Sequence, residues 1–92
     1  MNWDEIRTAY HVARLGTVSG AAEALGISQP GISNLIAELE RQTKLKLFER
    51  QRGSFVPTPE ASVLLQEVDT VVRGLDHVTQ AVVDLQNQKA GQ

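Results

Sequence analysis

The segment from residue 21 to residue 40 constrains the fold most strongly, because it holds two short helical patterns that meet at a tight turn. Gly26 suits the left-handed conformation that ends a helix, and Ser28 is a good N-cap for the next one. Pro30 then falls in the first helical turn, where its missing N–H removes a donor without an intrahelical partner. The segment predicts a helix-turn-helix whose second helix starts at about Gln29.

The second of these helices has an apolar face and a polar face. The spacing of three and four residues that marks a buried stripe is shared by Ile32, Leu35, Ile36 and Leu39. The polar face carries short side chains that allow close approach to base edges, and an Asn or Gln amide can pair with adenine in the major groove. We predict base contacts from Gln29, Pro30, Ser33 and Asn34. An ordinary helical hairpin with a polar outer face is the alternative.

Two short apolar and aromatic segments, 47–50 and 55–57, flank the polar turn 51–54 and predict a two-stranded wing. Gly53 can supply a positive φ in that turn. Basic side chains crowd into nine residues there against the single Glu49: they are Lys44, Lys46, Arg50 and Arg52. Such a patch suits phosphate oxygens, and Arg52 at the tip suits a minor groove. The alternative is a solvated hairpin whose charges prevent edge-to-edge aggregation.

Helix signals also mark the segment that precedes this region. Asn2 and Glu5 have the spacing of a capping box, and the helix they begin is expected to end near Gly16. Trp3 and Tyr10 lie on the apolar stripe of that helix, so we expect both in the core rather than stacked on bases. Together these signals predict a mainly α fold, with a three-helix core and a wing, over residues 1–58.

A long helix is predicted over residues 59–88, capped by Thr58 and followed by a frayed tail at 89–92. Its apolar residues alternate at spacings of three and four over four heptads, which is typical of a coiled-coil seam. We therefore predict a homodimer interface formed by Leu64, Val68, Val71, Leu75, Val78, Val82 and Leu85. A lone amphipathic helix that covers its own core is the alternative.

Composition limits the class of protein. The 92 residues suffice for one small domain and one further element. The absence of cysteine excludes a disulfide framework and a zinc finger, and no metal or other cofactor is predicted. Residues 1–58 carry seven Lys or Arg and six Asp or Glu, whereas 59–92 carry two and five, so the acidic excess lies in the second part. Without a signal peptide or an apolar run long enough to span a membrane, a cytoplasmic protein is expected.

Four stretches resemble the N-terminal DNA-binding domain of LysR-type transcriptional regulators: GTVSGAA at 16–22, LGISQPGIS at 25–33, LFER at 47–50 and PTPEA at 57–61. The resemblance implies a winged helix-turn-helix followed by a linker helix. It implies that Gln29, Pro30, Ser33 and Asn34 face bases, and that the phosphate backbone is contacted by Thr17, Ser28, Arg50, Arg52 and Gly53. Residues 52–53 and 74–76 further resemble the branch with LysR itself and the opine-catabolism regulators.

The chain departs from the family pattern at three places. Asn34 stands where arginine is common, Gly31 where alanine is common, and residues 43–46 replace the usual Leu-Gly turn before the wing. The first change concerns base preference, and the second weakens the recognition helix by about 0.5–1 kcal/mol relative to alanine. The third is expected to alter the approach to the wing.

The resemblance also implies partners. These are double-stranded DNA with an inverted-repeat operator, a second copy paired through antiparallel linker helices, and a small-molecule effector bound by a C-terminal domain. We expect that domain to be absent from this chain and the full-length protein to be a tetramer. The alternative function is a winged-helix module that docks a protein partner through its long helix. Enzyme activity has the least support, because His11 and His77 lack any arranged nucleophile or ligand cluster.

Overall fold

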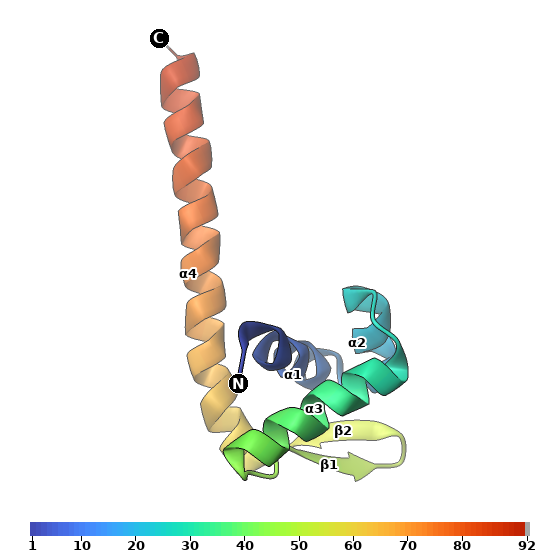
Figure 1. Ribbon diagram of the computed structural model, residues 1–92. Coiled ribbons are helices and arrows are strands. Elements are labelled where there is room, and N and C mark those ends of the chain that lie inside the picture. The colour runs from blue at the N-terminus through green and yellow to red at the C-terminus, as the bar shows by residue number, and fades with distance from the viewer. Residues whose placement is uncertain (92) are drawn as a thin grey trace.

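The computed structural model describes residues 1–91, and within them a small head sits at one end of a long helix (Figure 1). The head comprises residues 3–57, and the molecule measures 56 × 25 × 21 Å. The elements in chain order are α1 (Trp3–Leu15), α2 (Val18–Leu25), α3 (Gln29–Thr43), β1 (Phe48–Gln51), β2 (Ser54–Pro57) and α4 (Pro59–Ala90). The predicted fold class, a mainly α winged helix-turn-helix with a long helix after it, is confirmed.

Local capping explains where the first three helices begin and end. The Asn2 side chain accepts a hydrogen bond from the Glu5 N–H, and the Glu5 carboxylate accepts one from the Asn2 N–H, each at 2.9 Å. Gly16 and Gly26 take positive φ values of 78° and 67° after α1 and α2. The Ser28 hydroxyl accepts from the Gly31 N–H at 3.1 Å. The boundaries predicted from these residues are confirmed.

The core lies between α1, α2, α3 and the sheet. Its largest fully buried apolar side chains are Val12, Ile32, Leu39 and Leu47. Tyr10 is buried as predicted, but Trp3 is 39% exposed, so the prediction of a core position for Trp3 was wrong. Trp3 is the first residue of α1, beyond the elements that cover the middle of that helix. Hydrophobic spacing alone does not distinguish a helix end from its centre.

The wing is an antiparallel hairpin in which Arg50 faces Phe55 and Gln51 faces Ser54. Both residues of its turn have positive φ, 51° at Arg52 and 81° at Gly53, which is the geometry of a two-residue type I′ turn. The Phe55 N–H donates to the Gly16 carbonyl at 3.1 Å. This hydrogen bond holds the wing against the turn between α1 and α2.

A single carboxylate joins α3 to the wing. The Glu40 Oε2 atom accepts hydrogen bonds from the backbone N–H groups of Leu47 and Phe48, at 2.7 and 3.3 Å. Both residues are buried, so these N–H groups have little access to water. Between them and α3 lies Lys44, which ends the helix in the left-handed conformation with φ 59°.

The long helix α4 contacts the head only through its first turns. Ala61 and Val68 are buried there, Leu64 and Leu65 are half-buried, and residues 73–91 are all exposed. The helix continues to Ala90, two residues past the predicted end, so Lys89 and Ala90 are helical and Gln92 lies outside the described residues. In the described part of the chain, no helix is both long and apolar enough to cross a membrane.

Replacing Glu40 tests the link between α3 and the wing. Glu40→Ala leaves two buried backbone donors without a partner, so we expect the free energy of unfolding to fall by about 2 kcal/mol. Urea unfolding followed by circular dichroism measures this change. The control Glu49→Ala removes an exposed wing carboxylate and should change stability by less than about 0.5 kcal/mol. Equal losses in the two variants would contradict the assigned role.

The left-handed conformation at Lys44 is costly for a residue with a Cβ atom. We expect Lys44→Gly to raise the free energy of unfolding by about 1 kcal/mol, because glycine adopts this conformation without a steric penalty. The control Lys44→Ala removes the same charge and keeps the Cβ atom, so it should give no such gain. Thermal unfolding of both variants measures the difference, and identical midpoints would refute the explanation.

Candidate nucleic-acid interface

A surface hollow of about 700 Å³ lies where the N-terminal ends of α2 and α3 meet the wing. It is lined by Thr17, Val18, Ser19, Gln29, Pro30, Ser33, Arg50, Gly53 and Phe55. Three of the four predicted base readers and three of the five predicted phosphate contacts therefore share one surface. Asn34 lies outside the lining but is exposed on α3, directly after Ser33. Ser28 and Arg52, also outside it, are exposed at the cap of α3 and the wing tip.

The N-terminal ends of α2 and α3 both line this hollow. The caps Thr17 and Ser28 use their hydroxyl oxygens to accept from Gly20 and Gly31, at 3.0 and 3.1 Å. Each hydroxyl keeps its own proton for donation to an acceptor outside the chain. The partial positive charge at a helix N-terminus favours an anion nearby. The two caps are therefore suited to contact phosphate oxygens.

The Gln29 side chain is held by a neighbour that the sequence reasoning missed. Its Nε2 atom donates to the Ser19 Oγ atom at 2.8 Å, which links the start of α3 to α2. The carbonyl oxygen and the second amide proton of Gln29 remain free for a base edge. Ser19 lies within the motif at 16–22, but only the packing of α2 on α3 brings it to Gln29.

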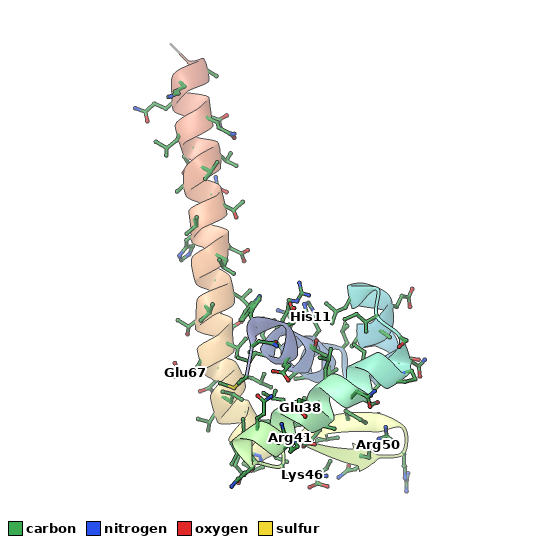
Figure 2. All side chains as sticks on the ribbon, in the orientation of Figure 1. His11, Glu38, Arg41, Lys46, Arg50 and Glu67 are labelled. Carbon is green, nitrogen blue, oxygen red and sulfur yellow. The ribbon has the colours of Figure 1, made fainter. Side chains whose placement is uncertain are left out.

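The wing provides positive charge beside the hollow. The Arg50 guanidinium lies over the Phe55 ring, 4.9 Å from its centre, so the cation is held on the inner side of the sheet. Lys46 and Arg50 both project from this region in Figure 2. The ion pairs among the described residues are Arg7 with Asp4, Arg41 with Glu38 and Arg73 with Asp69. In that part of the chain, the basic side chains of residues 44–52 thus take part in no ion pair.

On the exposed face of α3, in contrast to the wing, the basic side chain is paired with a carboxylate. Arg41 hydrogen-bonds Glu38, and this contact together with one from Gln42 lowers the pKa of Glu38 to about 2. Figure 2 shows Glu38 and Arg41 together on α3. Because Arg41 is already paired with Glu38, the nearest basic side chains that follow α3 and form no ion pair in the described part of the chain are those of residues 44–52.

The two histidines lie apart from the hollow. His11 is half-buried on α1, where burial, Arg7 and Arg14 lower its pKa, and His77 is exposed on α4. Among residues 1–91 there is no cluster of three or more His, Cys, Asp or Glu side chains that would hold a metal ion.

Part of the predicted dimer seam is taken up by the chain itself. Val68 is only 5% exposed and Leu64 is half-buried, because both pack on the head. The seam residues that remain exposed start one turn later and are Val71, Leu75, Val78, Val82 and Leu85, each between 49% and 62% exposed. An apolar stripe therefore faces solvent along the free part of α4.

Comparison with known proteins places this arrangement in a family. Residues 3–62, which include the hollow and the wing, match the family model of the bacterial regulatory helix-turn-helix proteins, lysR family. The chain belongs to the LysR family. The match covers most of the chain and confirms the family that the four sequence motifs resemble.

Relatives within the LysR family are similar along the whole of the chain. It is 41% identical over 91 residues to the octopine catabolism/uptake operon regulatory protein OccR of Rhizobium meliloti, covering 99% of this chain and 31% of that protein. It is 35% identical over 92 residues to the transcriptional activator protein LysR of Escherichia coli, covering 100% of this chain and 30% of that protein. The chain thus spans about a third of these relatives' length.

A solved structure shows the same fold. The BenM_DBD/benA site 1 DNA complex matches with a TM-score of 0.80 and 25% identity, over 92% of this chain and 96% of that chain. The high coverage of both chains means that the long helix is part of the shared architecture, not an addition to it.

Proposed function

We propose that this chain is the sequence-specific DNA-binding part of a transcription regulator that acts in the cytoplasm. The observation that carries the proposal is the hollow, which is lined by the N-terminal ends of α2 and α3 and by the basic wing. A phosphate backbone needs positive charge and N–H donors, whereas base edges need short polar side chains. The names of the relatives, which are regulatory proteins, and the DNA in the BenM structure support the proposal.

The side chains divide into two roles. In the proposed complex, α3 lies in the major groove and its base readers are Gln29, Pro30, Ser33 and Asn34. Phosphates are contacted by Thr17, Ser28, Arg50, Arg52 and Gly53, since these lie at helix caps or on the wing. The positive φ of Arg52 and Gly53 turns the wing tip sharply, which leaves Arg52 exposed to reach a minor groove.

The same proposal includes a homodimer through α4. Antiparallel pairing buries the exposed stripe that runs from Val71 to Leu85 and relates the two heads by a twofold axis. Two recognition helices then read the two halves of an inverted repeat. Because the relatives are about three times as long, we propose that the complete regulator has a further domain for a small-molecule effector and assembles as a tetramer.

A protein-interaction module remains the other class of function for this fold. Such a module needs an apolar docking surface, and the exposed apolar side chains of this chain gather on α4. The start of α3 presents Gln29, Pro30 and Asn34 instead, which favours DNA as the partner of the head.

Selection of binding sites from random duplex DNA tests the proposal. The wild-type chain should enrich an inverted repeat. Asn34→Ala should relax base preference at one position of each half-site by about 1–3 kcal/mol, because it removes a base-edge contact. Arg52→Ala should weaken binding to all sequences equally and reduce the salt slope by about 1, because it removes a phosphate contact.

The control for both variants is Glu23→Ala, which removes an exposed side chain of α2 outside the lining of the hollow. It should leave base preference unchanged. Enrichment of no sequence at low salt would refute DNA recognition and favour the protein-interaction module. Uniform effects of Asn34→Ala and Arg52→Ala would instead refute the division into base readers and phosphate contacts.

The dimer has its own test. Val78→Asp places a charge in the middle of the apolar stripe, where Val78 is 62% exposed in the single chain, and should give a monomer in sedimentation velocity. The control Asn87→Asp adds the same charge to an exposed residue on the opposite face of α4 and should leave the dimer intact. A Val78→Asp chain that still sediments as a dimer would exclude this seam.

A further inference from the structure

A chain of polar contacts connects α1 to α4 on the side of the head away from the wing tip. The Tyr10 hydroxyl donates to the Asp69 Oδ1 atom at 3.0 Å and accepts from the Arg14 Nη1 atom at 2.8 Å. The Asp69 Oδ2 atom lies 2.8 Å from the Arg73 Nε atom. Tyr10 is only 7% exposed, so its hydroxyl has little water as an alternative partner. Figure 1 shows α1 beside the lower part of α4, where these contacts form.

The rest of the contact between α4 and the head is small. Its apolar part consists of Ala61, Leu64, Leu65 and Val68, all in the first three turns of α4. Among the described residues, Asp69 makes the last hydrogen bond along α4 to another element, and Val72 is the last residue that is half-buried. A surface hollow of about 880 Å³ lies beside it, between Leu65 and Gly74 of α4 and Tyr10 of α1. The head therefore does not pack closely against this side of α4, so removal of the polar contacts leaves α4 free to tilt there.

A small tilt at this position has a large effect further along the helix. Val78, in the middle of the exposed stripe, lies roughly 15 Å beyond Val68 at about 1.5 Å per residue. A tilt of about 10° shifts this point relative to the head by roughly 2.6 Å, and a twofold dimer doubles the shift to about 5 Å. Successive base pairs are only about 3.4 Å apart.

We propose that the hydrogen bond between Tyr10 and Asp69 fixes the angle of α4 to the head and thereby selects the spacing between the two half-sites of the operator. The first part, the angle of α4, concerns the chain alone. The second part, the half-site spacing, rests on the proposed function. Tyr10 and Asp69 act as positioning residues, because neither lies on the DNA-facing hollow. They determine which spacing between the two half-sites is bound, although neither residue contacts a base.

Tyr10→Phe separates this role from core packing, because the ring stays and only the hydroxyl is lost. The angle is measured with spin labels on cysteines introduced at Ala24 on α2 and Asn87 on α4, both exposed; the chain has no cysteine of its own. Dilution with unlabelled chain keeps the measured distances within one protomer. We expect one narrow distance distribution in the wild type and one about twofold broader in Tyr10→Phe.

The control is Thr79→Val, which removes a hydroxyl of α4 that bonds only to the Leu75 carbonyl of the same helix. It should leave the distance distribution narrow. Asp69→Ala removes the other partner of the hydrogen bond and should broaden the distribution as Tyr10→Phe does, with no further broadening in the double variant. Distributions equally narrow in the wild type and in Tyr10→Phe would overturn the inference, whatever the chain does with DNA.

Spacing is then measured on duplexes in which the selected half-sites are separated by one or two base pairs more or fewer. The wild-type chain should lose affinity by about tenfold or more at the first altered spacing, and Tyr10→Phe by about threefold or less. Both should bind a single half-site equally, which a general loss of folding would not allow. An unchanged spacing preference in Tyr10→Phe would refute the second part, and a wild type that selects no site at all would refute the proposed function instead.

Discussion

The carboxylate of Glu40 determines how α3 and the wing are placed relative to each other. It accepts from two backbone N–H groups at the start of β1, so the wing leaves the end of α3 in one direction. The pairing of β1 with β2 then places Arg50 over Phe55, and the Phe55 N–H donates to the carbonyl of Gly16 in the turn between α1 and α2. The hollow depends on these contacts, because its lining comes from the start of α2, from α3 and from the wing.

Features of the head that depend on neighbouring residues were predictable from the sequence. Features that depend on contacts between distant residues were not. Gly26 and Pro30 specify the turn through their backbones and Ser28 through its capping hydroxyl, so the sequence predicts the start of α3 correctly. Trp3 fits the apolar stripe but is exposed, because burial depends on which elements cover the end of α1. The bond from Gln29 to Ser19 and the positive φ of Arg52 likewise depend on packing and on the demands of the whole hairpin.

The heptad pattern of α4 illustrates the same limit. Its period predicts which residues share a face, and the structure places those residues on one long helix. The period does not reveal that Val68 belongs to the head while Val71 faces solvent, because both positions fit the same repeat. The contact between the head and α4 ends where α1 and β2 no longer reach the helix, and the spacing of apolar residues in the sequence does not encode that point.

The exposed half of α4 has a thermodynamic consequence for the whole chain. From residue 73 to residue 91 every side chain of this helix is exposed, whereas most helical stability in proteins comes from the packing of an apolar face. In the proposed homodimer, ordering of this part of α4 is coupled to burial of its apolar stripe. The concentration of the dimer then rises with the square of the free chain concentration, so the population of the ordered helix depends on how much protein is present.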